Sequence, residues 1–357
     1  MPTETLDQAK TEAFAGQMIG ILNGATTAFM VSVGHRTGLF DKLAEIPPST
    51  AAEIARAAGL SERYVREWLG TMTTAGIVEH DASKGTYWLP AEHAASITRA
   101  AGPGNLAVMT EFMALIGSVE DQIVECFRNG GGVPYSAFPK FQQLMAQESA
   151  QVFDATLIDV TLPLANMAGR LETGIDVADV GCGSGHAINL MAQAYPNSRF
   201  AGFDFSEEGV ATGRAEAKAM GVTNAAFEQK DVSKLDAPAQ FDLITAFDAI
   251  HDQAQPRKVL KGIYDALRPD GVFLMADIAG DSTHAGNMEH PLAPMMYAIS
   301  TFHCMTVSLA LGGEGLGTMW GQQKAMELLE EAGFKPGNIE IKSVEGDIMN
   351  AYYVCRK

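Results

Sequence analysis

The sequence contains few cysteines, and their spacing argues against a disulfide-stabilised domain and against a cysteine metal site. Its 357 residues include four cysteines, which show neither the paired spacing of a disulfide framework nor a metal-binding pattern. Small secreted domains that depend on disulfides are therefore excluded, and we expect the reduced thiols of a cytoplasmic protein. The four are Cys126, Cys182, Cys304 and Cys355.

Basic residues are also scarce. Lysine and arginine total 25 against 43 aspartates and glutamates, which gives a net charge of −18 at pH 7. Nucleic acids and anionic membrane surfaces are polyanions, so this charge argues against both as partners. The sequence lacks a continuous apolar run of membrane-spanning length, and its first ten residues are too polar for a signal peptide. We therefore expect a soluble, cytoplasmic protein.

The length suffices for about two domains, and the pattern of apolar residues changes along the chain. Residues 1–100 are mostly helical with two short strands, residues 101–172 form a helical connector, and residues 173–357 alternate strands with helices. Such alternation predicts an α/β domain built on a mainly parallel sheet.

A glycine-rich stretch organises the α/β segment. Residues 177–180 are apolar apart from Asp179, and a turn with three glycines then leads into a helical pattern. A buried strand that feeds a helix through such a turn begins a nucleotide-binding βαβ unit. Glycine permits close approach of the backbone to a ligand and positive φ angles. Asp204 ends the next apolar run, where an acidic side chain can accept both ribose hydroxyls.

Two classes of nucleotide compete for this unit. A dinucleotide-binding motif, G-x-G-x-x-G, would place its third glycine at His186, whereas the spacing here is G-x-G-x-G. Asp179 also places a carboxylate at the strand end, which repels a pyrophosphate but suits an ammonium or sulfonium group. S-adenosylmethionine carries both cations and no phosphate, so it is the expected ligand.

From Asp179 to Gly185 the chain resembles the first motif of the class I S-adenosylmethionine-dependent methyltransferases. The resemblance implies a Rossmann-like sheet of seven strands. It also implies that Asp231 accepts a hydrogen bond from the adenine amino group, with Val232 beside the ring. Further strands are predicted at residues 225–228, 241–246 and 272–277, with a final hairpin of 339–343 and 351–355. The expected cofactor-binding residues are Asp179, Gly181, Cys182, Gly183, Gly185, Asp204, Phe205, Asp231, Val232, Phe247 and Asp248.

The N-terminal segment has the pattern of a winged helix. Two predicted helices joined by a tight turn precede two short strands, at residues 76–80 and 86–89. Winged helices often bind DNA, but residues 40–97 hold five basic residues against eight acidic ones, so a phosphate-binding surface is not predicted. The module resembles the N-terminal dimerisation domain of small-molecule methyltransferases. The apolar helix predicted at residues 11–37 also favours a homodimer, and packing on its own domain is the alternative.

His251 is the candidate catalytic base. It follows the fourth predicted strand, at the sheet edge where ligands bind in α/β proteins, and imidazole titrates near neutral pH. A hydroxyl acceptor needs its proton removed, which a positioned base accelerates. The segment from Ile250 to Gln253 resembles the His-Asp segment of plant-type O-methyltransferases, which implies that His251 is the base and that Asp277 orients it. Residues 253–255 are Gln-Ala-Gln where that family has Trp-Ser-Asp. The alternative is a structural or cofactor-side histidine.

The acceptor is expected to meet an insertion at residues 278–321. This segment is apolar, aromatic and rich in methionine, as suits an adaptable pocket wall; helices that pack on the N-terminal domain are the alternative. Tyr135 follows three glycines and a proline in a predicted mobile connector, or in an ordinary loop between helices. No metal site is predicted, since His284, His290 and Asp277 fit no known ligand spacing. The expected acceptor contacts are Tyr135, His251, His303 and Trp320.

Taken in full, the chain resembles bacterial winged-helix methyltransferases known mainly from mycobacterial members. The predicted function is methyl transfer from S-adenosylmethionine to a small, largely apolar acceptor, at oxygen, by a homodimer. N- or S-methylation without a general base is an alternative. From a different class, a cofactor-responsive DNA-binding regulator with an inactive methyltransferase domain also remains open.

Overall fold

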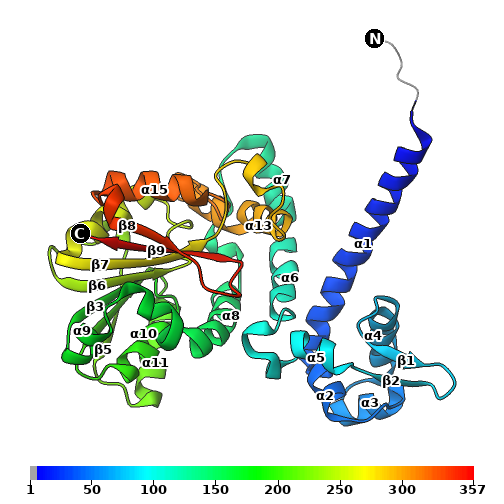
Figure 1. The fold of residues 1–357 in the computed structure, drawn as a ribbon. Coiled ribbons are helices and arrows are strands. Elements are labelled where there is room, and N and C mark those ends of the chain that lie inside the picture. The colour runs from blue at the N-terminus through cyan, green and yellow to red at the C-terminus, as the bar shows by residue number, and fades with distance from the viewer. Residues whose placement is uncertain (1–5) are drawn as a thin grey trace. The chain divides into compact units, whose positions relative to one another are not determined.

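The computed structural model describes residues 6–357. The chain divides into two compact units, Met1–Ala114 and Leu115–Lys357, which are described in turn (Figure 1). The first unit is mostly helical, and the second is built on a large sheet.

The first unit has the predicted winged-helix pattern. Thr50 begins α3 with a capping box, since its side chain accepts from the Glu53 backbone while the Glu53 carboxylate accepts from the Thr50 backbone. Trp68 fills the core, where its ring meets the edge of Phe40 at 5.1 Å and its indole N–H donates to the carbonyl of Met30. The elements are α1 (Gln8–Thr37), α2 (Leu39–Glu45), α3 (Ala51–Ala58), α4 (Glu62–Thr74), β1 (Glu79–Asp81), β2 (Thr86–Trp88) and α5 (Ala91–Ile97).

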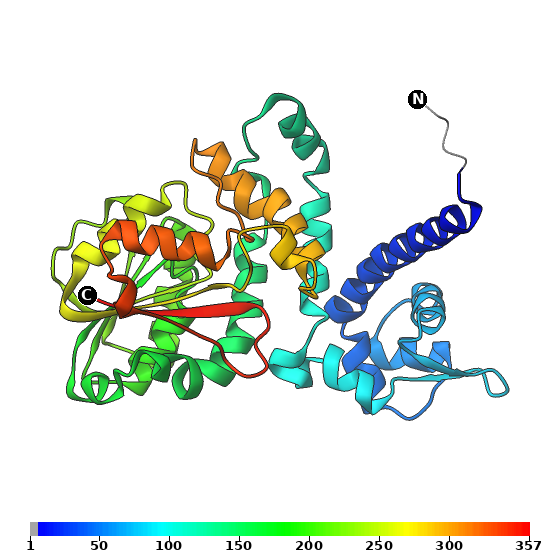
Figure 2. The same cartoon turned by 45° about the horizontal axis from the view of Figure 1, so that its top comes forward.

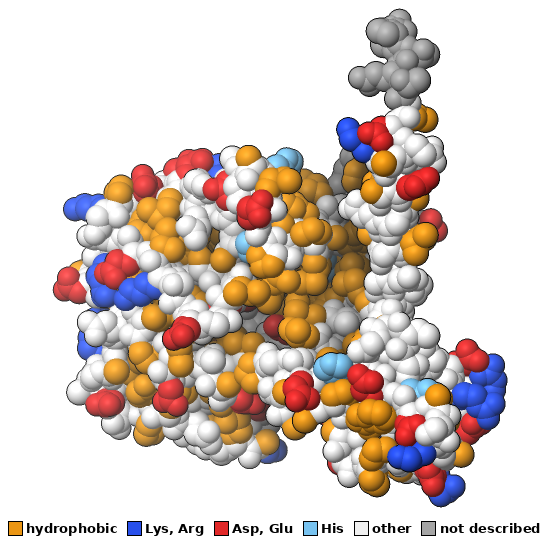
Figure 3. Space-filling model, turned by 45° about the vertical axis from the view of Figure 1, so that its right-hand side comes forward, with side chains coloured by type: hydrophobic (Ala, Val, Ile, Leu, Met, Phe, Trp, Pro, Cys, Tyr) orange, Lys and Arg blue, Asp and Glu red, His pale blue; other side chains and the backbone are white. Residues whose placement is uncertain are grey.

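Helix α1 is long, apolar and largely exposed. Phe14, Ile19 and Leu22 each leave 60–62% of their surface accessible, and apolar side chains are visible along the helix in Figure 3. By length and composition alone, α1 could cross a membrane. The expectation that no segment reaches membrane-spanning length is therefore wrong on those two criteria, because alanine and glycine between the larger residues keep the helix apolar.

The helical segment that leads into the sheet is more broken than the sequence predicts. Within the predicted helical connector of residues 101–172, the chain leaves α8 through a π turn at Leu157–Thr161 and a 3₁₀ turn at Leu162–Ala165. Pro163 cannot donate a helical hydrogen bond, and Asn166 adopts a left-handed φ of 55°. The helices here are α6 (Glu111–Gly117), α7 (Glu120–Asn129), α8 (Phe141–Thr156) and α9 (Ala168–Thr173).

The sheet of the second unit has seven strands in the order β5-β4-β3-β6-β7-β9-β8, with β9 antiparallel to both neighbours. The predicted seven-stranded, Rossmann-like fold is therefore confirmed. The strands are β3 (Asp176–Val180), β4 (Arg199–Asp204), β5 (Ala225–Gln229), β6 (Phe241–Phe247), β7 (Leu267–Ile278), β8 (Ile339–Lys342) and β9 (Asn350–Arg356).

Helices cover both faces of this sheet (Figures 1 and 2). One core joins the sheet to α12 (Pro256–Ala266) and α15 (Gly321–Ala332), and a second joins it to α9, α10 (His186–Ala194) and α11 (Glu207–Met220). Ser206 caps α11, since its hydroxyl accepts from the Gly209 backbone. The insertion after β7 is helical and holds α13 (Ala293–Ile299) and α14 (Met305–Ala310).

Parallel pairing sets the location of the site. β3 pairs with β4 and β6, and β6 pairs with β7, all in parallel. The carboxyl ends of these strands therefore meet at one edge of the sheet, where ligands bind in open α/β folds.

Candidate active site

A cavity of about 520 Å³ lies at the carboxyl edge of the sheet. Its wall combines the loop after β3, the ends of β4 and β6, and one side of α8. Ten of the eleven expected cofactor-binding residues line it, all except Gly185.

The glycines of the loop are required by their positive φ angles and, at Gly181 and Gly185, by neighbouring residues that leave no room for a Cβ atom. Gly181, Gly183 and Gly185 have φ angles of 75°, 53° and 75°. A Cβ at Gly181 would lie 2.6 Å from that of Ala249. Gly185 stands behind the cavity wall, where a Cβ would collide with the ring of Phe227. This third glycine therefore permits packing of α10 on the sheet and is not a ligand contact.

Two buried aspartates flank the loop. Oδ2 of Asp204 accepts from the backbone N–H of Gly183 at 2.8 Å, and Oδ1 accepts from that of Ser206 at 2.8 Å. Oδ1 of Asp179 accepts from the Thr245 hydroxyl at 2.6 Å. Burial raises the pKa of Asp204 and raises the pKa of Asp179 to about 7. Asp204 thus fixes the loop and also lines the cavity.

The far end of the cavity carries Asp231 and Val232. The Asp231 carboxylate accepts from the backbone of Ser233 and pairs with Lys234 at 2.7 Å, and Lys234 is the main cause that lowers the pKa of Asp231. Val232 is buried beside it. Asp231 therefore stays ionised and presents an acceptor next to an apolar surface.

Helix α8 supplies a cavity wall that the sequence motifs did not reveal. Phe141, Met145, Ser149 and Phe153 line the cavity and recur every fourth residue. That spacing was the available indication, since one face of a helix repeats at this interval. His186 ties α8 to the glycine loop's helix, with Nε2 at 2.9 Å from Asp154 and Nδ1 at 2.7 Å from Glu216.

His251 and Asp277 meet as predicted. Nδ1 of His251 lies 2.8 Å from Oδ1 of Asp277, and both residues are buried. The same oxygen accepts from the indole Nε1 of Trp320 at 3.0 Å and from the backbone of Ile278 at 2.9 Å. On the other side of the ring, Nε2 lies 3.2 Å from Oδ1 of Asp252.

Asp252 is the residue of this group that lines the cavity, and sequence reasoning did not select it. His251 lies behind it with 4% of its surface exposed. The available indication was its place directly after the histidine, in the segment that resembles the His-Asp segment of plant-type O-methyltransferases. The wall continues through Gln253, Val307 and Leu311.

The structure separates the expected acceptor contacts. Tyr135 lines the cavity, accepts from Nε2 of Gln142 at 2.7 Å and meets the ring of Phe205 edge-on at 5.1 Å. His303 is 1% exposed and stacks on Phe141, so it supports the wall from behind. Trp320 is 5% exposed within the sheet core, and its indole N–H is directed at Asp277. The prediction that Trp320 contacts the acceptor is therefore wrong. Its side chain is buried in the core that packs on the sheet and does not line the cavity.

Comparison with protein families agrees with the two units. Residues 25–99 match an Rv2258c-like winged HTH domain, and residues 171–333 match a methyltransferase domain. The chain joins a winged helix-turn-helix domain to a methyltransferase domain. Together with the cavity described above, this domain indicates S-adenosylmethionine as the cofactor.

Sequence relatives match less than half of the chain. Malonyl-[acyl-carrier protein] O-methyltransferase of Bacillus cereus is 21% identical over 148 residues, which cover 42% of this chain and 49% of that protein. Trans-aconitate 2-methyltransferase of Deinococcus radiodurans is 32% identical over 111 residues, 31% of this chain and 40% of that protein. The chain thus spans about half, or less, of the length of these curated relatives.

Solved structures share the fold over nearly the entire chain. A putative O-methyltransferase of Nostoc punctiforme superposes with a TM-score of 0.73 at 17% identity, covering 96% of this chain and 98% of that one. Human N-acetylserotonin methyltransferase, in complex with S-adenosylmethionine, gives 0.71 at 20% identity, with coverage of 100% and 99%. The mitomycin 7-O-methyltransferase MmcR gives 0.71 at 18%, with coverage of 98% and 100%.

Proposed function

We propose that the protein transfers a methyl group from S-adenosylmethionine to a hydroxyl of a small, largely apolar acceptor. The observation that carries the proposal is the placement of His251 and Asp277 beside an acid-flanked glycine loop at one sheet edge. The cofactor supplies an electrophilic methyl group on a sulfonium when it is bound. The protein then contributes alignment of the acceptor, exclusion of water and proton removal.

The residues of the cavity fit this cofactor better than they fit a dinucleotide. Among the described residues on its wall, Lys230 and His186 are the only basic side chains. Lys230 lies 3.4 Å from Glu228, and both His186 nitrogens face carboxylates. A pyrophosphate would therefore lack a free countercharge. Asp204 suits ribose hydroxyls, Asp231 suits the adenine amino group, and Asp179 lies at the end where an ammonium group is favoured.

The acceptor end of the cavity accounts for the rest of the chemistry. Val307 and Leu311, from the helical insertion and the loop after it, line it, which favours an apolar acceptor. Asp277 holds the Nδ1–H of His251, so Nε2 is the nitrogen that can exchange a proton with the acceptor. Burial lowers the pKa of His251, but the Asp277 and Asp252 carboxylates outweigh burial and raise this pKa well above its usual value, which suits a base. Because Asp252 lies between this nitrogen and the cavity, the acceptor hydroxyl is expected to contact Asp252 as well.

Calorimetry and turnover together test the proposal. Purified protein is titrated with S-adenosylhomocysteine and separately with NAD⁺, and methyl transfer from labelled S-adenosylmethionine is then measured against a panel of phenols, alcohols, amines and thiols. We expect heat with S-adenosylhomocysteine alone and label in a hydroxyl-bearing product. Heat with NAD⁺ and none with S-adenosylhomocysteine would overturn the proposal.

N-methylation is the second candidate, and one observation favours it. The Asp252 carboxylate is the polar group of the His251 cluster that reaches the cavity, and a carboxylate attracts an amine acceptor. The same panel separates the two, because the labelled product then carries the methyl group on nitrogen. S-methylation would be read from the thiols in the same way.

The first unit supports a dimer better than a DNA complex. On α4, Arg63 pairs with Glu67 at 2.5 Å and Arg66 with Glu62 at 2.5 Å, so both arginines are neutralised on their own helix. The apolar side chains that α1 exposes favour burial against a second copy. We expect a cytoplasmic protein that forms a homodimer, and light scattering after gel filtration tests the dimer. We also expect no salt-sensitive gel shift with genomic fragments.

A further inference from the structure

His303 is a buried histidine whose two ring nitrogens both lack a hydrogen-bond partner. The residue is 1% exposed, and neither Nδ1 nor Nε2 meets a donor or an acceptor within residues 6–357. Buried polar atoms are rarely left in this state, and each one without a partner lowers the stability of the fold. His303 also lies in a π-helical turn, Ser300–Cys304, and such turns are frequent at functional sites. The two nitrogens therefore point to a partner outside the chain.

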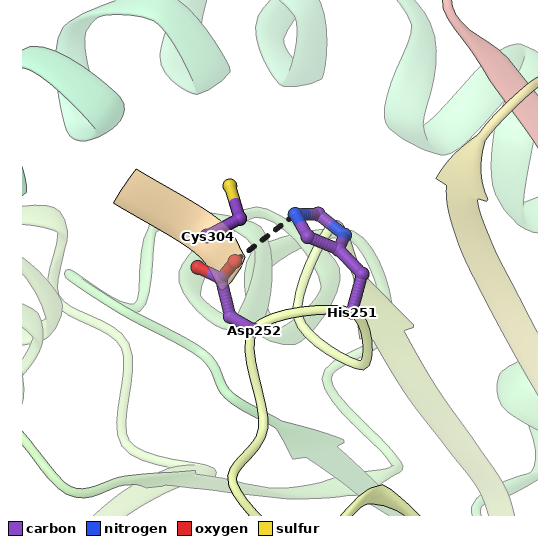
Figure 4. Close-up of side chains that lie close together, drawn as sticks. All are labelled: His251, Asp252 and Cys304. Atoms are coloured by element: carbon purple, nitrogen blue, oxygen red, sulfur yellow. Dashed lines mark ion pairs between the residues drawn. The ribbon is translucent and has the colours of Figure 1, made fainter. Parts of the chain in front are cut away.

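This histidine lies close to the acceptor end of the cavity. Cys304 follows it in the chain, and Sγ of Cys304 lies within 4.8 Å of a ring nitrogen of His251 and of a carboxylate oxygen of Asp252. Figure 4 shows these three side chains grouped together, with the ion pair between His251 and Asp252. Val307, four residues after His303, lines the cavity itself. His303 is thus placed beside the group that acts on the acceptor.

Two aromatic rings separate His303 from the cavity. Phe141 stacks on the imidazole with 3.6 Å between ring centroids, and Tyr135 meets it edge-on at 5.6 Å. Both Phe141 and Tyr135 line the cavity. The Tyr135 side chain is partly exposed, and its hydroxyl accepts from Nε2 of Gln142 at 2.7 Å. A rotation about the side-chain bonds of Tyr135 would cost this hydrogen bond and the edge-on contacts, but it would move no backbone.

The charge state of His303 decides which groups it can bind. Burial lowers the pKa of His303 to about 4, so the ring is neutral at physiological pH. A neutral imidazole offers one N–H donor and one nitrogen acceptor. A carbonyl or a hydroxyl matches these atoms. A carboxylate would find no positive charge on His303 and would be repelled by Asp252 and Asp204, which both line the cavity.

We propose that the acceptor carries a second, uncharged polar group, and that His303 hydrogen-bonds to this group once Tyr135 has rotated aside. The inference rests on the proposed function and narrows its acceptor. The acceptor then has an apolar body, a hydroxyl that receives the methyl group, and a carbonyl or second hydroxyl elsewhere. The methylated hydroxyl still gives its proton to His251. The competing interpretation is that His303 only fills space behind Phe141.

Matched pairs of small phenols test the inference by binding, independently of turnover. Protein loaded with S-adenosylhomocysteine is titrated calorimetrically with the ortho, meta and para isomers of hydroxyacetophenone and with the corresponding ethylphenols, in which a methylene replaces the carbonyl. An apolar pocket alone would favour the ethylphenols. We expect at least one hydroxyacetophenone to bind about 2- to 12-fold more tightly than its ethylphenol, the range that one neutral hydrogen bond supports. The corresponding hydroxybenzoates should bind more weakly than either.

Variants of His303 separate recognition from packing. His303→Phe keeps a ring against Phe141 but removes both nitrogens, so the preference should change to the ethylphenol. His303→Asn and His303→Gln restore a donor and an acceptor, and at least one of them should recover part of the original preference. His303→Phe should not lower the urea midpoint, because no hydrogen bond within the chain is lost. His93→Phe is the control, since His93 contacts the carbonyl of Ile77 in the first unit. It should lower the midpoint and leave the preference unchanged.

The outcomes separate this inference from the proposed function. If the unaltered protein binds no hydroxyacetophenone, or binds none more tightly than its ethylphenol, the inference is overturned. A preference for the carbonyl that persists in His303→Phe would overturn it as well. Binding of S-adenosylhomocysteine and methyl transfer to other hydroxyls would then still support the proposed function. Conversely, a preference that depends on His303, in a protein that methylates no hydroxyl, would refute the proposed O-methylation alone.

Discussion

Trp320 donates a hydrogen bond from its indole Nε1 to Oδ1 of Asp277, the oxygen that also holds His251. Trp320 directly precedes α15, Asp277 lies near the end of β7, and His251 follows β6, so three elements meet at one atom. The remaining oxygen of Asp277 is buried without a partner in the described part of the chain. The Nδ1 side of His251 is therefore held by a single carboxylate oxygen, which Trp320 also contacts.

Replacing Trp320 by phenylalanine should lower kcat while leaving cofactor affinity unchanged. The variant keeps most of the buried ring but removes one hydrogen bond to a charged group, worth about 1.5–3 kcal/mol, so a loss of roughly 10- to 100-fold is expected. Steady-state kinetics and calorimetry with S-adenosylhomocysteine measure the two quantities. Trp68→Phe, in the core of the first unit, is the control for loss of a buried indole N–H. An equal fall in kcat for both variants would contradict the positioning role.

Removal of His251 should abolish turnover. His251→Ala eliminates the group that acts on the acceptor, for which a loss of about 10²–10⁴-fold is typical. The ring does not line the cavity, so affinity for S-adenosylhomocysteine should stay near that of the unaltered protein. His93→Ala is the matched control, because His93 contacts the carbonyl of Ile77 within the first unit. Unchanged turnover in His251→Ala would remove the residue from the mechanism.

Gly185 should tolerate alanine worse than an open glycine with the same backbone angle. Both Gly185 and Gly221 have positive φ, 75° and 72°, but a Cβ at Gly221 meets nothing within 4 Å, whereas one at Gly185 collides with Phe227. The φ strain alone costs on the order of 1–2 kcal/mol, and overpacking adds about 1–3 kcal/mol. Denaturant unfolding of Gly185→Ala and Gly221→Ala measures the difference. Equal destabilisation of the two variants would contradict this prediction, because it would mean that the contact between residue 185 and Phe227 relaxes at no cost in stability.

The link through His186 should weaken as the pH rises. Each ring nitrogen faces a carboxylate, Asp154 on α8 and Glu216 on α11, so both nitrogens carry protons when both bonds form. Burial lowers the pKa of His186, but the two carboxylates outweigh it and raise the pKa above its usual value. A raised pKa in the folded state stabilises the protein fully below the unfolded pKa of about 6.5, and the stabilisation disappears as the pH passes the folded value.

The measurement is the difference in melting temperature between the unaltered protein and His186→Gln across this pH range. The difference should be largest below pH 6.5 and shrink at higher pH. Asp154 is largely exposed, so the total effect should stay within about 1 kcal/mol. A difference that grows with pH would contradict the assignment of charge to His186.

The cofactor half of the site was predictable because its residues are close in sequence. Asp179 and the three glycines belong to one strand and turn, and Asp204 ends the next strand, so the sheet topology alone brings them together. The pairing of His251 with Asp277 was implied by the resemblance to plant-type O-methyltransferases. The topology accommodates it, because β6, which His251 follows, is paired in parallel with β7, which holds Asp277 near its end.

The remainder of the site depends on packing that no local pattern encodes. Helix α8 reaches the cavity through a tertiary contact, and its periodic face gave no hint of what it covers. Trp320 and Cys304 both approach His251 from the long insertion, whose path is set by how its helices pack. For this reason Trp320 was expected to contact the acceptor, whereas its indole N–H in fact donates to the buried carboxylate of Asp277.

The acidic wall of the cavity has a consequence for competition in the cell. Adenine nucleotides share the adenosine part of the methyl donor, but their phosphates would lie against Asp179 with neither Lys230 nor His186 free to neutralise them. Under the proposed function, we therefore expect the strand that carries the glycine loop to disfavour ATP. On the same proposal, occupancy of the cavity would then follow the ratio of fresh to spent methyl donor and be indifferent to the energy charge of the cell.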